Sequence, residues 1–313
     1  MDYAFGLFQP GFWGYALYTF IVAQITIAAV TLYLHRDQAH RGLELHGALR
    51  HFFRFWLWLT TGIATREWVA VHRKHHAHCE TEDDPHSPQV YGLKKVLLEG
   101  AELYKEAGAE PGMQDKFGRG TPDDWIERNV YARGNYYLGI MLMLVIDVML
   151  FGVVGLTVFA LQMMVIPFSA AGIINGVGHH SGYRNFECTD AARNIVPWGV
   201  LLGGEELHNN HHAFPSSSRF SMRPWEFDMG WFYITILSKL GLARVRRVAP
   251  EPVKAKEARA DLETLRAVMM NRMHVLREYS NSVTLPELRK EVATAKGHLR
   301  KMLRKARTLL VRQ

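Results

Sequence analysis

The sequence predicts an all-α fold in which an integral membrane helical anchor carries a cytoplasmic helical cap with a histidine-rich dimetal site. Three observations lead to this prediction: long uncharged apolar runs, clusters of histidine just outside those runs, and a chain start without Lys or Arg. The chain has 313 residues, of which 16 are His, 37 are Lys or Arg and 30 are Asp or Glu. This length suffices for one large domain and an appendage.

Charge divides the chain into two parts. Residues 251–313 hold 15 Lys or Arg and 7 Asp or Glu, whereas the first 250 residues hold 22 and 23, so the excess positive charge lies in the tail. We therefore expect a domain at 1–250 and a basic amphipathic helical tail at 251–313. The cysteines, Cys79 and Cys188, are too few and too far apart for a disulfide scaffold, a Cys-ligated zinc module or an iron–sulfur cluster.

Three apolar segments are long enough to cross a bilayer as helices. The first, at about 12–34, contains 23 residues without a charged side chain. The other two, at about 136–160 and 161–178, contain Asp147 as their single charged residue and are joined by a tight turn near Gly152–Gly155 or Gln162. Three such runs favour crossings over buried core helices. The start lacks the basic region of a signal peptide.

A fourth apolar stretch, at about 52–65, is shorter and contains Arg54. We expect it to lie in the membrane interface. If it crossed the membrane, the histidines at 35–40 and 72–76 would face opposite sides and could not share a site. Lys and Arg are absent before the first crossing and from the turn between the last two, so the positive-inside rule places 35–135 and everything after 178 in the cytoplasm.

The remaining segments are predicted to form soluble helices. Residues 92–135 contain a break at Gly108–Gly120, and the acids of 121–124 suit a helix start. In the tail we expect one helix at 261–279 and a second that begins with a capping box at 284–287. The second carries an apolar seam at steps of four and three residues, made of Leu288, Val292, Ala295, Leu299, Met302, Ala306 and Leu309.

Histidines gather in three clusters, at 35–40 (HRDQAH), 72–76 (HRKHH) and 208–212 (HNNHH), with a further pair at 179–180. Residues three or four apart share a helix face, so the second and third clusters each present three imidazoles to one side. His35 and His40 are five residues apart, a poorer register, and we expect them to bind from a helix end. One such motif alone is ordinarily a surface feature, but three on one side of the membrane indicate a metal site.

Imidazole suits iron, zinc, copper and nickel. Eight or nine imidazoles exceed what one ion can use, so we predict two ions with four or five nitrogens each. Acids near the clusters are expected to orient the rings, namely Asp37, Glu67, Glu82, Asp83, Asp84, Asp190, Glu205 and Glu206. The histidines without ligand spacing are not expected to bind metal, namely His46, His51, His78, His86, His274 and His298.

These motifs resemble the histidine boxes of membrane fatty-acyl desaturases. HRDQAH, HRKHHAHCETEDDPHSP, NGVGH and GGEELHNNHHAFP are similar, in order and spacing, to the three boxes and the extra histidine of that family, above all of its bacterial acyl-CoA delta-9 (stearoyl-CoA type) branch. The similarity covers about residues 12–232 and leaves out the basic tail.

The resemblance implies a non-haem diiron centre. By motif its ligands would be His35, His40, His72, His75, His76, His179, His208, His211, His212 and, through water, Asn175. His180 is not part of the family pattern. No catalytic residue beyond the metal ligands is implied.

The implied reaction inserts a cis double bond, expected at delta-9, into a saturated acyl chain with O2 as co-substrate. The acyl carrier would be CoA, acyl carrier protein or phospholipid. Two electrons would come from an external donor such as ferredoxin, rubredoxin or a cytochrome with its reductase, docked near the third box. The implied location is the bacterial inner membrane, with the active site on the cytoplasmic side. A dry channel for the acyl chain is expected, with Trp56, Trp58, Trp68 and Trp225 as candidate lining residues.

Two other functions remain open. A diiron lipid hydroxylase shares the histidine boxes. A membrane metal-binding or transport protein is the alternative of another class, although a transporter needs ligands at membrane depth, where this sequence has only Asp147.

The tail also has more than one interpretation. It could clamp anionic headgroups, form a coiled-coil contact or pack on the body as a solvated hairpin. A nucleic-acid partner is not expected, because no base-reading motif accompanies the charge.

Overall fold

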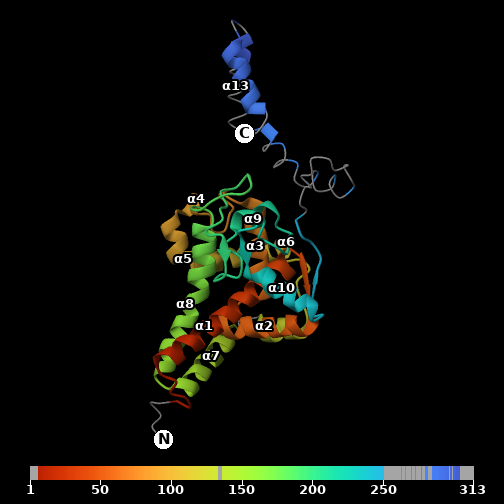
Figure 1. Cartoon of the computed structure of the whole chain (residues 1–313). Coiled ribbons are helices and arrows are strands. Elements are labelled where there is room, and N and C mark those ends of the chain that lie inside the picture. The colour runs from red at the N-terminus through yellow and green to blue at the C-terminus, as the bar shows by residue number, and fades with distance from the viewer. Residues whose placement is uncertain are drawn as a thin grey trace. The chain divides into compact units, whose positions relative to one another are not determined.

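The computed structural model describes residues 6–132 and 136–249, and in the tail 284–295 and 299–303 with isolated positions between 262 and 297. Contacts divide the chain into two units, Met1–Ala249 and Pro250–Gln313, which are described separately. The first unit is mostly helical with four short strands among its described residues, so the expected helical fold is confirmed at that level. In Figure 1, α1, α7 and α8 form an elongated bundle that adjoins the part containing α3 and α9.

The first apolar run forms α1 (Gly11–Ala29), which continues without a break into the π-helix η1 (Val30–Ala39). Together they make an apolar helix of 29 residues, five longer at its end than the expected segment at 12–34. The extension matters because η1 contains His35, so the apolar helix itself delivers the first histidine cluster. Leu32, Tyr33 and Leu34 of η1 are buried in one core cluster with Leu57 and Ile234.

The helix expected at 52–65 is displaced in the structure. α2 spans Gly47–Thr61 and α3 spans Thr65–His78. The His46 side chain accepts a hydrogen bond from the backbone N–H of Ala48 at the start of α2. At its end Gly62 adopts φ 66°, a left-handed conformation that terminates helices. With these two caps, α2 starts five residues before and ends four residues before the limits of the expected segment at 52–65.

The boundary expected between residues 160 and 161 is wrong. The chain reverses at Gly152, with φ 62°, between α7 (Tyr136–Phe151) and α8 (Val154–Ile166). α8 continues into the π-helix η3 (Pro167–Val177), and the two form an apolar helix of 24 residues. α7 has only 16 residues. The reversal therefore uses the first of the two glycine-containing turns considered from the sequence.

Asp147, the single charged residue of these apolar runs, is fully buried on α7. Its Oδ1 atom accepts a hydrogen bond of 3.0 Å from the hydroxyl of Tyr18 on α1. The charge thus faces a neighbouring helix and not the outer surface of the bundle, as expected for an acid within an apolar segment.

The other helices of this unit's described residues are α4 (Pro88–Tyr91), α5 (Leu93–Gly108), α6 (Met113–Phe117), the π-helix η2 (Glu127–Tyr131), α9 (His208–Ala213) and α10 (Met229–Lys239). α5 ends at Gly108, at the start of the expected break. Asp124 accepts a hydrogen bond from the N–H of Glu127, which confirms a helix start at 121–124.

Four short strands pair in two sheets. β1 (Leu43–Leu45) is antiparallel to β4 (Ala243–Val245), and β2 (Trp198–Gly199) is parallel to β3 (Phe227–Asp228).

In the second unit, α13 spans Leu285–Thr294. The expected capping box is wrong, because Thr284 has helical backbone angles and its side chain makes no capping hydrogen bond. α13 also ends inside the predicted seam, at the extended residue Ala295. The helix expected at 261–279 falls for the most part outside the described residues.

A buried ion-pair network joins α2 to η2. Arg54, with 4% of its side chain exposed, bonds Asp124 at 2.7 Å and Glu127 at 2.9 Å. Replacing Arg54 by Met leaves the carboxylate of Glu127 buried without its cation, and we expect a loss of about 3–5 kcal/mol in the free energy of unfolding. Denaturation of the purified protein in detergent, followed by circular dichroism, measures this change.

The matched control is Arg66→Met. Arg66 bonds Asp115 at 2.7 Å, but both side chains are largely exposed, so the loss should be at most about 1 kcal/mol. Equal losses for the two variants would contradict the buried network.

Candidate metal centre

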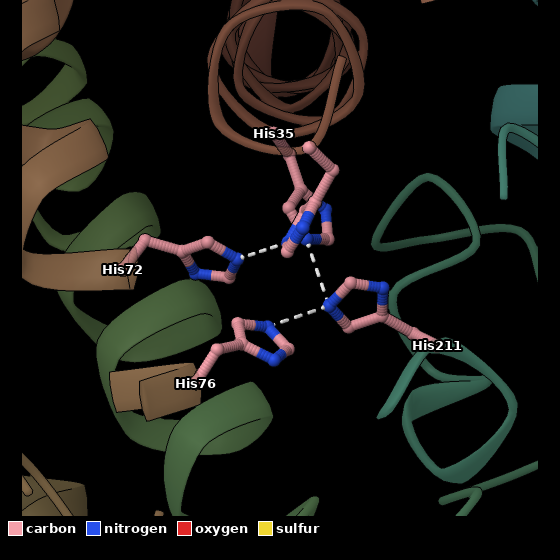
Figure 2. Close-up of side chains that lie close together, drawn as sticks. His35, His72, His76 and His211 are labelled. Carbon is pink, nitrogen blue, oxygen red and sulfur yellow. Dashed lines mark hydrogen bonds between the residues drawn. The ribbon is translucent and has the colours of Figure 1, made fainter. Parts of the chain in front are cut away.

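The first histidine cluster draws on all three sequence clusters. His35, His40, His72, His76 and His211 each place one ring nitrogen within 4.8 Å of the others. The Nε2 atoms lie 3.1 Å apart between His35 and His211, 2.9 Å between His211 and His76, and 2.7 Å between His40 and His72. Figure 2 shows the four labelled rings pointing toward one another, His72 and His76 from α3, His35 from η1 and His211 from α9.

The expectation that His35 and His40 are poorly in register is wrong, because η1 is a π-helix. In a π-helix the N–H bonds the carbonyl five residues earlier, so a step of five residues returns to the same face. The N–H of His40 donates to the carbonyl of His35 at 3.0 Å, and the two ring centres lie 4.9 Å apart. The five-residue spacing, which is unfavourable in an α-helix, therefore lets the side chains of His35 and His40 converge in the wider turn of the π-helix.

The second cluster consists of His75, His179, His208 and His212. Nε2 of His179 lies 3.2 Å from Nε2 of His75 and 2.9 Å from Nε2 of His208. The ring of His212 is 4.7 Å from that of His179 and stacks at 4.4 Å on that of His76, a member of the first cluster. The two clusters are thus adjacent, and α3 supplies rings to both.

The distances between nitrogens fit shared metal ions. Two imidazole nitrogens bound to one ion at roughly 2.1 Å and at a right angle lie about 3 Å apart, and the values here run from 2.7 to 3.2 Å. Burial lowers the pKa of His72, His76, His208, His211 and His212 well below the ordinary value, so these rings are neutral. Neutral imidazole is the form that binds metal.

Four carboxylates bond the outward nitrogens of the rings. Nδ1 of His35 lies 2.7 Å from Glu205, Nδ1 of His75 lies 2.9 Å from Asp84, and Nδ1 of His212 lies 3.0 Å from Asp190. These three acids were among those expected. Each contact leaves Nε2 of its ring free to face the centre of the cluster, which is how outer partners fix the tautomer of a metal ligand.

The fourth carboxylate, Glu80, was missed. It lies 2.9 Å from Nδ1 of His179 and also accepts hydrogen bonds from Ser87 and from the N–H of Ala191. Burial alone would raise the pKa of Glu80, but its bonds to His179 and Ser87 outweigh burial and hold that pKa below its ordinary value. One signal was in the sequence, because Glu80 follows His76 by four residues within the acidic stretch after the second cluster.

Other expected acids do not bond the rings. Asp37 bonds Arg50 at 2.6 Å, and Glu206 accepts from the backbone N–H groups of Leu202 and Gly204. Glu67 makes no contact with the rings among the hydrogen bonds of the described residues, and burial raises the pKa of Glu67. Glu82 and Asp83 are exposed.

The remaining histidines differ in their surroundings. His78 is half-buried on α3, 3.7 Å from Asp83. His46 caps α2, and His51 and His180 are exposed. His86 was expected outside the site, but it is buried with its ring 4.4 Å from that of His75. His274 and His298 lie outside the described residues, and Asn175 is half-buried on η3 four residues before His179.

The tryptophans expected around an acyl channel differ in burial. Trp68 stacks on His72 at 4.9 Å with an angle of 11° between the rings. Trp58 is buried in a core cluster with Val22 and Met143. Trp225 is 62% exposed, which does not fit the lining of a dry channel.

Asparagines between the histidines hold α9 in place. Asn209 donates to the carbonyls of Phe186 and Ala192, and Asn210 donates to Glu226 at 2.8 Å. Asn210 also accepts a hydrogen bond from Asn194 at 3.0 Å. These contacts fix the six-residue helix that carries His208, His211 and His212.

The fold and this geometry define a class of protein that can hold two adjacent metal ions on nitrogen ligands at the end of an apolar helical bundle. Residues 10–234 match the family model described as Fatty acid desaturase. The chain therefore belongs to the fatty acid desaturase family, whose members are membrane-associated oxidoreductases that act on fatty acyl chains.

Relatives agree with this assignment. The chain is 30% identical over 223 residues to the probable lipid desaturase ADS3.2, chloroplastic, of Arabidopsis thaliana, covering 68% of this chain and 58% of the relative. It is 27% identical to delta-9 acyl-lipid desaturase 2 of Arabidopsis thaliana, with 79% of each chain covered. It is 30% identical to the acyl-CoA C20 delta5-desaturase of Anemone leveillei, with 80% of each covered.

The contact between Glu205 and His35 yields a prediction about metal affinity. Glu205→Gln keeps the size of the side chain but removes the charge that orients His35, so the affinity for iron should fall roughly 10–100-fold. Titration of the metal-free protein with Fe²⁺ measures it.

Glu206→Gln is the control, because Glu206 is the next residue and bonds only backbone N–H groups in the contacts described above. The iron affinity of this variant should change less than threefold, which is well below the loss expected when the carboxylate that orients a metal ligand is removed. Equal losses for both variants would argue against an orienting role of Glu205.

Proposed function

We propose that this protein is an O2-dependent fatty acyl desaturase that inserts a cis double bond, at delta-9, at a non-haem diiron centre with electrons from an external donor. The observation that carries the proposal is the convergence of nine imidazoles in two adjacent clusters in a member of the desaturase family. Relatives named as delta-9 and delta-5 desaturases make delta-5 the competing position.

The clusters divide the ligands between two ions. His35, His40, His72, His76 and His211 would hold one ion, and His75, His179, His208 and His212 the other, with Asn175 acting through water. The donor set fits, since Nε2 of His212, which faces inward, is buried without a hydrogen-bond partner among the described residues. When bound, the iron pair supplies O2 activation strong enough to remove hydrogen from an unactivated CH2 group.

The protein's own side chains bind, orient and shield. Glu205, Asp84, Glu80 and Asp190 hold the outward nitrogens of His35, His75, His179 and His212, so the inward nitrogens of these four rings stay directed at the ions. A small, mostly apolar pocket lies between the helices of α1–η1 and α8–η3, lined by Ile27, Val30, Thr31, Ile166, Ser169, Ala170, Ile174, Leu202 and Glu205. This pocket contacts the carboxylate that bonds His35, and it marks the side from which an alkyl chain kept from water would approach the first cluster.

The two long apolar helices support a membrane location. We propose that Gly11–Ala39 and Val154–Val177 cross the membrane, that α7 returns the chain between them, and that α2 lies in the interface. The Lys and Arg of the intervening segments support the further proposal that the metal centre faces the cytoplasmic side of a bacterial inner membrane.

Expression in a host that lacks unsaturated fatty acids, followed by mass spectrometry of double-bond position, tests the proposal. We expect new monounsaturated chains with the bond at delta-9. His179→Ala should abolish them, because it removes a ring that adjoins His75 and His208. His75→Ala should do the same.

His180→Ala is the matched control, since this exposed neighbour of His179 bonds only Ser181 in the contacts described. It should keep the product. Hydroxylated chains without a new double bond would assign the protein to the lipid hydroxylases. Bound iron with no oxidation of any lipid would favour the metal-binding alternative.

Deleting residues 251–313 gives an independent prediction. Every proposed ligand and the whole family match lie before residue 250, so iron content and product per protein should stay within about twofold. Loss of the product with iron retained would give the tail a part in the reaction, and loss of membrane association alone would support the headgroup clamp.

A further inference from the structure

Three arginines meet beside the first histidine cluster. Arg73 donates to the carbonyls of Gln38 and Ala39 at 2.8 and 3.0 Å, and to the carbonyl of Arg119 at 2.8 Å. Arg41 donates to the same carbonyl of Arg119 at 3.1 Å. These contacts bring the end of η1, the middle of α3 and the loop after α6 to one place.

These positive charges are not neutralised locally. None of the three guanidinium groups bonds a carboxylate among the residues that the structure describes. Asp115 is bonded to Arg66, and Lys116 is exposed beside it. We call Arg41, Arg73, Lys116 and Arg119 the basic patch; Arg41, Lys116 and Arg119 are exposed.

The backbone is strained to keep this arrangement. Arg41 has φ 54°, a left-handed conformation that costs energy for any residue with a Cβ atom. Gly120 has φ 75°, and a Cβ atom there would lie 2.1 Å from Nη2 of Arg41. Strained positions of this kind cluster at functional sites.

The basic patch adjoins two proposed ligands of one metal ion. Arg41 follows His40 and Arg73 follows His72, so in each case the neighbouring Cα atoms are about 3.8 Å apart. The Nε2 atoms of His40 and His72 lie 2.7 Å from each other. The apolar pocket instead adjoins His35, through Glu205. The patch and the pocket therefore approach the cluster through different histidines.

We propose that the basic patch binds the acidic face of the separate protein that delivers electrons to the metal centre. This inference rests on the proposed function, which needs an external reductant, and it moves the docking site from the third histidine box to the first two. Opposite charges steer such short-lived encounters and orient the partners. An anionic substrate headgroup is the competing ligand, but the pocket for the apolar chain adjoins a different histidine.

Binding of small redox proteins tests this inference without reference to lipid product. The probes are an acidic [2Fe–2S] ferredoxin, an acidic rubredoxin and an acidic cytochrome domain. Each is titrated by calorimetry into the full-length, iron-loaded protein in phosphatidylcholine nanodiscs. We expect one of them to bind, and Arg119→Glu and Lys116→Glu each to weaken that binding about tenfold. Added salt should weaken binding to the unchanged protein more than binding to the variants.

Lys94→Glu is the control, because Lys94 is an exposed cation in the first turn of α5, where a helix tolerates an acid. It should change binding less than twofold, because Lys94 is not part of the basic patch. Reversing a charge within the docking interface should have the larger effect given above. Unchanged iron content in Arg119→Glu and Lys116→Glu shows that the fold is intact.

Several results would overturn the inference. One is that none of the three probes binds, and another is that a probe binds equally to all variants. A third is that the patch variants no longer bind acyl-CoA or phosphatidylglycerol vesicles but still bind the redox protein. If the redox protein binds through the patch but no unsaturated lipid forms in the expression test, the desaturase proposal fails and the docking surface stands.

Discussion

The structure depends on one constraint, the burial of neutral imidazoles that must all direct a nitrogen inward. A buried ring without a fixed proton position could turn or accept a charge, and either would disperse the cluster. The carboxylates at Glu205, Asp84, Glu80 and Asp190 prevent this by bonding the opposite nitrogen of their rings. The elements that carry these acids are therefore as necessary to the centre as those that carry the histidines.

The same constraint explains the departure from α-helical geometry. η1 is the end of a long apolar helix, and an α-helix would place only one of His35 and His40 on the inner face. Widening the turn brings both rings inward while the helix stays continuous with α1. His35 lies in this helix and His40 directly follows it, so the position of the metal centre relative to the apolar run is fixed. The pocket between this helix and η3 is lined by Ile27, Val30 and Thr31, which precede His35 on the helix.

The sequence could predict the side chains of the centre but not the backbone that assembles them. The histidine clusters, together with the family motif that favours His179 over His180, predicted the nine rings of the two clusters, but not His86 beside His75. The π-helical register, the contact of Glu80 with His179 and the approach of His86 depend on long-range packing, which periodicity does not report. Helix ends were missed for a similar reason. Gly152 and Gly62 decide where α7 and α2 stop through their left-handed conformation, whereas hydrophobicity continues past both positions.

The third histidine cluster shows how much depends on residues between the ligands. A helix of six residues is too short to be stable by itself in water. Its stability must come from outside, and Asn209 and Asn210 provide it through bonds to loops at 186–194 and 220–226. Both asparagine side chains are fully buried and hydrogen-bonded, so an apolar substitute would leave several backbone groups and Glu226 without a partner. The asparagines therefore determine where His208, His211 and His212 point, and the motif is a structural unit as well as a set of ligands.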